Sequence, residues 1–191
     1  MNFYISDLHF GHTNIIKFDG RPFKNIEEMH KTIITNWNNV VTNEDTVHIL
    51  GDFCWEVESN WPRYLEQLNG KKILIQGNHD IKSPSKQTKK YFLDIKPLKE
   101  VKDEGRRVIM CHYPIPMYRG AYDKNMYMLY GHVHNTREET FIRELRQKMR
   151  LSCTEIGYNR GQLYNVGCMM PWMDFTPRTL DEIIERDKEF I

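Results

Sequence analysis

Short apolar segments recur along the chain, and each is followed at once by a cluster of Gly, Asp, Asn or His. The segments are rich in Ile, Val, Leu, Tyr and Met and alternate only weakly between apolar and polar residues, which predicts strands buried on both faces. This pattern constrains the fold more than any other feature, because such strands need a layer on each side. We expect strands over residues 2–6, 46–50, 72–76, 107–111 and 127–130.

Helical patterns lie between and after these strands. Apolar residues recur at helical spacing from Ile26 to Val40, and Asn25 with Glu28 three residues later is typical of a helix N-terminus. Strands that alternate with helices indicate an α/β fold, and the scarcity of helices after residue 77 indicates a mixed sheet. Further helices are expected over 61–68, through 141–149, and from Thr179 onward.

The length and charge of the chain exclude some classes of protein. No repeat or linker is visible, so residues 1–191 are expected to form one domain. The chain contains 27 Lys and Arg against 26 Asp and Glu, a formal net charge of +1. Proteins that coat nucleic acid or bind a membrane surface by charge carry a large positive excess, which this chain lacks.

The sequence also favours a reduced, cytoplasmic setting. No apolar run approaches the ~18–20 residues that cross a bilayer, so no membrane partner is expected. No secretory leader is visible after Met1, and the four cysteines form no C-x-x-C pair.

The polar residues at the strand ends predict a metal site. Ligands of an open α/β sheet gather beyond the carboxyl ends of the strands, so we expect these residues to meet although they span much of the chain. Carboxylates, a carboxamide and imidazoles without a thiolate suit Mn²⁺, Fe, Ni or Zn. The candidate residues are Asp7, His9, Asp52, Asn78, His79, His112, His132 and His134.

The number of candidate ligands favours two ions over one. One tetrahedral site uses fewer ligands than are present, whereas two ions that share a carboxylate would use them all. Two divalent ions partly neutralised by Asp7 and Asp52 leave a charge of about +2, which attracts a phosphoryl group and favours a deprotonated water.

The motifs, in their order, resemble those of the calcineurin-like metallophosphoesterases, and in particular the small bacterial and phage phosphoesterases of that family. The resemblance rests on Asp-x-His at residues 7–9, Gly-Asp at 51–52, Gly-Asn-His-Asp at 77–80, Cys-His at 111–112 and Gly-His-x-His at 131–134. It implies a fold of two packed, mixed β-sheets flanked by helices, a four-layer sandwich.

The resemblance also implies a role for each residue. Asp7, His9 and His134 would hold the first metal, Asp52 would bridge, and Asn78, His112 and His132 would complete the second. His79 would lie over the phosphate as a general acid or a cationic stabiliser. Asp80 would orient His79 through a carboxylate–imidazole hydrogen bond.

These roles lead to the expectation of a dinuclear metal-dependent phosphoesterase. A metal-bridging hydroxide would attack phosphorus in line, with Mn²⁺ as the first choice of ion and Fe, Ni or Zn as alternatives. A chain without a separate cap domain favours phosphodiesters or nucleotide-like substrates. A nuclease, a phosphomonoesterase and a non-catalytic scaffold remain as alternatives, and the complete ligand set argues against the last.

Substrate contacts are less specified by the sequence. Candidates are His12, Arg21, Tyr118 and Arg119. The alternative interpretations are a loop histidine bonded to the backbone for His12, an exposed surface arginine for Arg21, and a rigid loop that packs its own aromatic residues for Tyr118 and Arg119. Residues 137–160 lie where many small relatives continue directly into a final strand, so we expect a partial insertion that borders the site. The oligomeric state is not indicated.

Overall fold

The first sheet is formed by the N-terminal half of the chain, in which buried strands alternate with helices. The computed structural model describes residues 1–156 and 160–190. Neighbouring strands are all parallel, in the order β1 (Asn2–Ile5), β2 (Thr46–Ile49), β3 (Lys71–Ile75) and β4 (Phe92–Lys96).

The second sheet is mixed, as the sequence predicts. Its strands, in spatial order, are β5 (Leu98–Asp103), β6 (Arg106–Cys111), β7 (Met126–Tyr130) and β8 (Leu163–Asn165). The first of these runs antiparallel to its neighbour and the other pairs are parallel. The two-sheet α/β fold is therefore confirmed, with the difference that the first sheet is parallel throughout.

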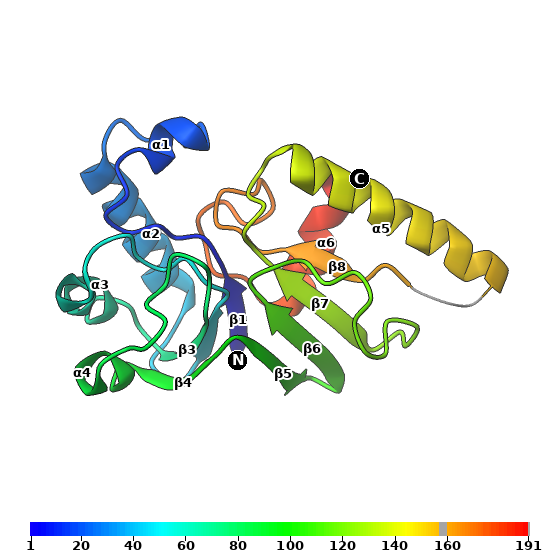
Figure 1. Ribbon diagram of the computed structural model, residues 1–191, viewed down its shortest axis with the longest axis horizontal. Helices are drawn as coiled ribbons and strands as arrows, with labels where there is room; N and C mark the ends of the chain where they lie inside the picture. The colour runs from blue at the N-terminus through cyan, green and yellow to red at the C-terminus, as the bar shows by residue number, and fades with distance from the viewer. Residues whose placement is uncertain (157–159, 191) are drawn as a thin grey trace.

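Helices flank the sheets at the outer sides (Figure 1). The N-cap at Asn25 and the capping box of Thr179 with Glu182 both form as expected. The predicted 61–68 helix is shorter than expected, and the one predicted through 141–149 is longer. The helices are α1 (Ile15–Phe18), α2 (Ile26–Val40), α3 (Pro62–Leu65), α4 (Lys86–Lys89), α5 (Arg137–Ile156) and α6 (Leu180–Asp187), with 3₁₀ turns η1 (Glu58–Asn60) and η2 (Lys188–Phe190).

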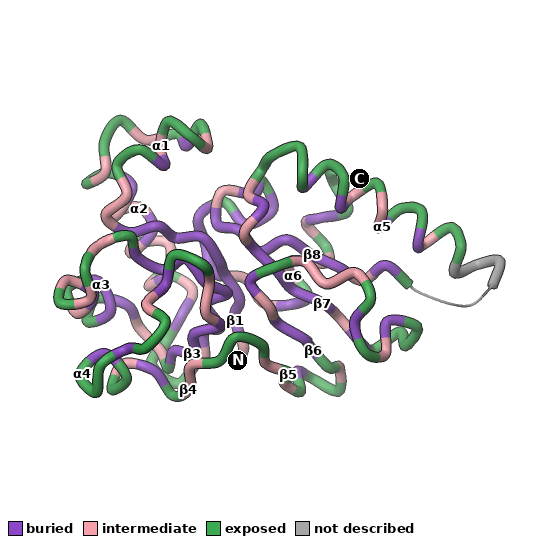
Figure 2. The backbone as a smooth tube through the Cα atoms, in the orientation of Figure 1, coloured by how far each residue is buried: buried purple, intermediate pink, exposed green. Residues whose placement is uncertain are grey.

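Alternate residues of the second sheet face different layers. Val108 and Met110 belong to the main core, which also contains Trp37 of α2. Ile109, between them in sequence, belongs to a second core with Ile142 of α5. Figure 2 shows the inner strands of both sheets as continuously buried backbone, whereas β4 and β5 are partly exposed. Burial on both faces explains why the strand segments read as continuous apolar runs.

The two sheets meet where β1 ends. The N–H of Ser6 donates to the carbonyl of Val166 at 2.8 Å, and the N–H of Cys168 donates to the carbonyl of Ser6 at 2.9 Å. The chain just after β8 therefore pairs with the chain just after β1. This junction places the loop that follows β1 beside the loop that follows β7.

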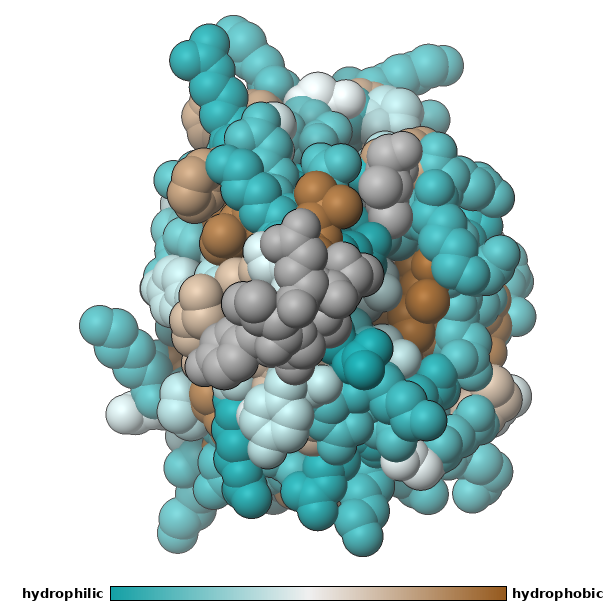
Figure 3. All heavy atoms as spheres, turned by 90° about the vertical axis from the view of Figure 1, so that its right-hand side faces the viewer, coloured by the Kyte–Doolittle hydropathy of each residue, from teal (hydrophilic) through white to brown (hydrophobic). Residues whose placement is uncertain are grey.

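No helix in the described part of the chain is long and apolar enough to cross a membrane. The face of the molecule seen in Figure 3 is mostly hydrophilic, with small, scattered hydrophobic patches.

Candidate metal centre

Loops at the carboxyl ends of β1, β2 and β7 bring four metal-type side chains together. Donor atoms of Asp7, His9, Asp52 and His134 all lie within 4.8 Å of one another. The Nε2 atoms of His9 and His134 are 3.3 Å apart, and His9 Nε2 is 3.7 Å from Asp52 Oδ2. Three of the four side chains are buried, so an ion held between them would be shielded from bulk water.

A second group of donors lies on the other side of Asp52. His112 Nε2 is 3.5 Å from Asp52 Oδ2 and 3.0 Å from Asn78 Oδ1. The ring of His132 is 5.1 Å from that of His112, and its backbone N–H donates to both carboxylate oxygens of Asp7 at 3.2 Å. The carboxylate of Asp52 thus lies between two sets of donors.

Hydrogen bonds on the far ring nitrogens orient two of the histidines. His112 Nδ1 donates to the carbonyl of Leu50 at 2.7 Å, and His134 Nδ1 donates to Asp19 Oδ1 at 2.7 Å. A carbonyl oxygen only accepts, and Asp19 at neutral pH only accepts, so each proton belongs on Nδ1. Each Nε2 lone pair then faces the other donors, as in metal-ligating histidines.

Asp19 is a functional residue that the sequence reasoning missed. It is the middle residue of Phe-Asp-Gly, a sequence typical of a turn, and it belongs to none of the motifs at the strand ends. No sequence signal distinguishes it from an ordinary turn aspartate.

Buried charge supports a cation at this place. Burial raises the pKa of the Asp7 carboxyl. Burial acts in the same direction on Asp52, but hydrogen bonding and charge from His112 outweigh it and lower that pKa to about 2. Burial disfavours protonation of His112, yet the two carboxylates raise its pKa to about 9. Positive charge nearby would therefore stabilise the ionised carboxylates of Asp7 and Asp52. A divalent cation bound to these donor atoms would supply that charge.

The backbone at the ligands adopts an uncommon conformation. Residues other than glycine rarely have positive φ, and such a residue costs about 1–3 kcal/mol. Each loop turns sharply where its strand ends, so that the side chain points back toward the other ligands. The ligands with positive φ are Asp7 (56°), His9 (51°), Asp52 (51°), His132 (70°) and His134 (48°).

Two glycines allow the loops to approach one another. A Cβ on Gly131 would lie 2.0 Å from Ser6 Oγ and 2.5 Å from Asp7 Oδ2. A Cβ on Gly77 would lie 2.3 Å from Asp52 Oδ1. Glycine is required at both positions because any side chain would push the ligand loops apart.

His79 lies at the exposed mouth of the site. Its ring is 6.0 Å from that of His9, and its backbone N–H donates to Asp52 Oδ1 at 3.0 Å. The side chain is therefore held beside the donors while it remains open to solvent.

Asp80 has different partners from those expected. Its buried carboxylate accepts hydrogen bonds from the backbone N–H groups of Asp52, Phe53 and Gly77 at 2.8–3.0 Å. In the described residues it forms no hydrogen bond with the His79 ring. The expectation of a carboxylate–imidazole hydrogen bond is therefore wrong. The carboxylate of Asp80 instead holds the two loops that carry Asp52 and His79. The pattern of residue types is the same for both roles, so the sequence could not distinguish them.

Arg21 is not a substrate contact. Its side chain is fully buried, and its guanidinium donates to the carbonyls of Asp7 at 2.9 Å and Leu8 at 3.2 Å and pairs with Asp19 at 2.8 Å. All of these groups belong to the loop after β1 and the turn beside it. The expectation of a phosphate clamp is wrong, because the cation is used to hold the ligand loop.

Tyr118 is also not a substrate contact. Its side chain is buried, and its hydroxyl lies 3.3 Å from the carbonyl oxygens of both Met126 and Gln162. The interpretation as packing within the loop is the correct one. Arg119 is exposed, and its contact with substrate stays a prediction.

His12 lies next to the site without joining the ligand group. Its ring is 5.5 Å from that of His9 and stacks on Trp55 at 4.1 Å with an interplanar angle of 11°. Its predicted contact with substrate is compatible with this position and stays a prediction.

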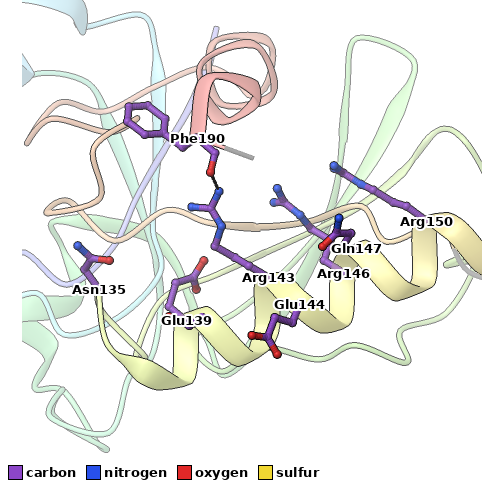
Figure 4. A pocket seen from close by; sticks show the side chains of 9 residues that line it. Asn135, Glu139, Arg143, Glu144, Arg146, Gln147, Arg150 and Phe190 are labelled. Carbon is purple, nitrogen blue, oxygen red and sulfur yellow. Dashed lines mark hydrogen bonds between the residues drawn. The ribbon is translucent and has the colours of Figure 1, made fainter.

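The first turn of α5, which lies in the segment expected to be an insertion, is linked to the loop of His134 through Asn165. Asn165 donates to the carbonyl of His134 at 3.2 Å and to Glu139 Oε2 of α5 at 2.9 Å. A cavity of about 350 Å³ lies along the same helix, and several arginines line it (Figure 4). Two of these arginines are already engaged: Arg146 pairs with Asp187 and Arg143 donates to the carbonyl of Phe190. The start of α5 thus lies close to the loop that carries His134, and the cavity along the helix is lined by other residues than the candidate metal centre. That residues 137–160 are an insertion stays a prediction.

The layered α/β sandwich gathers aspartate, histidine and asparagine at the ends of its strands, and these donors suit a divalent metal ion. The chain belongs to the calcineurin-like phosphoesterase superfamily, whose domain model matches residues 2–169. Members of this family use divalent metals and hydrolyse phosphate esters, so the chain is a metal-dependent phosphoesterase.

Known proteins are similar to the chain in sequence and in structure. An uncharacterised protein of Methanocaldococcus jannaschii is 36% identical over 160 residues, which cover 82% of this chain and 83% of that protein. The gene 66 protein of Mycobacterium phage L5 is 34% identical over 80 residues, 40% of this chain and 38% of that protein. A crystal structure of a protein of unknown function from Aquifex aeolicus is 30% identical, with a TM-score of 0.67, and the match covers 97% of this chain and 98% of that one.

Proposed function

We propose that this protein hydrolyses phosphodiesters or nucleotide-like phosphate esters at a centre of two divalent ions. The observation that carries the proposal is the position of Asp52, whose carboxylate lies 3.7 Å from His9 Nε2 on one side and 3.5 Å from His112 Nε2 on the other. A single ion would leave one of these donor sets unused.

Seven side chains would hold the two ions. When bound, the ions would activate a water and neutralise the charge that develops on the phosphoryl oxygens. We propose Mn²⁺ because the donors are carboxylate, amide and imidazole without thiolate; Fe, Ni and Zn are the alternatives. The first set is Asp7, His9 and His134, the second is Asn78, His112 and His132, and Asp52 is shared.

His79 would act on the leaving group. Its exposed ring lies beside the donors, so the imidazole can protonate the departing oxygen or stabilise its charge as a cation. Asp80 would contribute indirectly, because its carboxylate holds the backbone of the loops that carry Asp52 and His79.

The test compares His79→Ala with Lys82→Ala, an exposed control on the same loop. Metal-stripped protein is resupplied with Mn²⁺, Ni²⁺ or Zn²⁺ and assayed on mono- and diesters of p-nitrophenol. We expect metal-dependent diesterase activity that falls about 10²–10⁴-fold in His79→Ala, with two equivalents of metal retained. Full activity in that variant would remove the role of His79, and a wild-type protein inert with every ion and ester would refute the proposed function.

A further inference from the structure

Two aromatic side chains stand exposed at the mouth of the metal centre. Trp55 is 47% exposed and Tyr113 is 46% exposed. The other three tryptophans, Trp37, Trp61 and Trp172, are at most 1% exposed. Single exposed rings are common on protein surfaces, so it is the location of these two beside the candidate ligands that is informative.

Trp55 lies at the side of the first ligand set. Its ring is 4.5 Å from that of His79 and 6.2 Å from that of His9. His12 stacks on it at 4.1 Å, which occupies part of one face. The Trp55 backbone N–H donates to the carbonyl of Phe10 at 2.8 Å, and this bond anchors the residue to the loop after β1. The indole is thus fixed in place while almost half of it remains open.

Tyr113 lies at the side of the second ligand set. It directly follows His112, and its ring meets those of His132 and His112 edge-on, at 4.5 Å and 5.3 Å. In the described part of the chain its hydroxyl has no hydrogen-bond partner. An apolar hollow of about 400 Å³ is lined by the next residue, Pro114, together with Val133 and Phe141. A flat, apolar group on this side would therefore find both a ring and space.

The two rings lie at opposite ends of the row of ligands. The ring of Trp55 lies near that of His9, and the ring of Tyr113 lies near that of His112. The carboxylate of Asp52 lies between these two histidines. A phosphate held over the shared carboxylate would have an aromatic surface on each side. A phosphodiester has two ester groups that leave phosphorus in different directions, so each could contact one ring.

We propose that Trp55 and Tyr113 are stacking surfaces that select phosphodiesters whose ester groups carry a flat ring, such as a nucleobase or an aryl group. This inference rests on the proposed diesterase function and specifies the substrate class. Stacking of a base on an aromatic side chain changes affinity by about 5- to 150-fold. Neither ring touches the reacting atoms, so both are specificity residues.

The kinetic test uses two diesters with the same leaving group. Thymidine 5′-(p-nitrophenyl) phosphate and methyl p-nitrophenyl phosphate both release p-nitrophenolate, so the ratio of their kcat/KM values reports on the second ester group. We expect a ratio that favours the thymidine ester and falls at least about 5-fold in Tyr113→Leu or Trp55→Leu. Trp55→Phe should preserve the ratio, and Tyr122→Leu, another exposed aromatic residue, is the matched control.

A binding test uses the exposed tryptophan itself. Adenosine 5′-monophosphate should quench the tryptophan fluorescence of the metal-loaded protein at concentrations that inhibit turnover, and Trp55→Phe should abolish the quenching. Methyl phosphate should inhibit without quenching.

An unchanged ratio in both leucine variants and in the double variant, or inhibition by the nucleotide without quenching, would overturn the inference. Equal loss of activity on both diesters in both leucine variants would also overturn it, because it would show that the rings only support the fold. Equal loss in one variant alone is expected, since the p-nitrophenyl ring that both diesters share would stack on that residue. If the protein hydrolyses neither diester but still shows nucleotide quenching that requires Trp55, the proposed function fails while the binding surface stands.

Discussion

Asp19 should control the affinity of the metal centre although it belongs to no motif. One carboxylate oxygen accepts from His134 Nδ1 at 2.7 Å, and the other accepts from Arg21 Nε at 2.9 Å. Both partners are donors. The amide of Asp19→Asn offers one acceptor and one donor, so one of the two partners must face an N–H group.

Either orientation of the amide is costly. If its oxygen faces Arg21, its NH₂ group faces His134 Nδ1, and the imidazole proton is driven to Nε2, where it blocks a metal. If its oxygen faces His134, the buried guanidinium loses its counter-charge. Loss of such an orienting partner lowers metal affinity about 10–100-fold, which corresponds to about 1.4–2.7 kcal/mol.

Isothermal titration of metal-stripped protein with Mn²⁺ measures this change. Glu100→Gln removes the same charge from a surface pair with Arg107, at 2.6 Å, and should bind Mn²⁺ as the wild type does. Circular dichroism checks that both variants fold. Equal Mn²⁺ affinity in Asp19→Asn, Glu100→Gln and wild type would refute the argument that Asp19 sets the protonation of His134.

Three more expectations follow from the contacts around the site. Asp52→Asn should lose at least one equivalent of metal by elemental analysis, since it removes the carboxylate between the donor sets; two retained equivalents would contradict its shared role. Gly131→Ala should cost about 1–3 kcal/mol in urea unfolding, because its Cβ would overlap Ser6 Oγ and Asp7 Oδ2; unchanged stability would show that the loops can separate freely. Burial raises the pKa of Glu139 to about 7. The folded state therefore keeps a proton that the unfolded chain releases at lower pH. The stability that this proton contributes is lost as pH rises through 7. Relative to wild type, Glu139→Gln should gain up to about 3 kcal/mol between pH 4.5 and 8.5, and a pH-independent difference would contradict this.

The grouping of the candidate ligands could be predicted because it follows from topology. Asp7, Asp52 and His112 each come directly after a buried strand, and parallel strands end at the same edge of a sheet. Residue type and position after a strand were therefore enough to predict that side chains more than a hundred residues apart lie close together.

Side chains that act through hydrogen bonds could not be assigned in the same way. Arg21 and Tyr118 have the chemistry of substrate contacts, but the fold buries both and uses their polar atoms on backbone carbonyls. Asp80 fixes backbone N–H groups where an imidazole partner was expected. Whether such a side chain is buried, and which group it bonds to, depends on how the loops pack in three dimensions. The residues next to it in the sequence do not determine either.

The junction between Ser6 and the chain after β8 has a consequence for the newly made protein. β1 is at the edge of the first sheet, and its continuation pairs with Val166 and Cys168. Val166 and Cys168 are translated 160 and 162 positions after Ser6 (166 − 6 and 168 − 6), a delay of about 8–30 s at ribosomal rates. During that time the unpaired edge is open to association with other chains. A ribosome that stalls before residue 166 therefore produces a chain that carries every candidate ligand but leaves the edge of β1 unpaired and prone to aggregate.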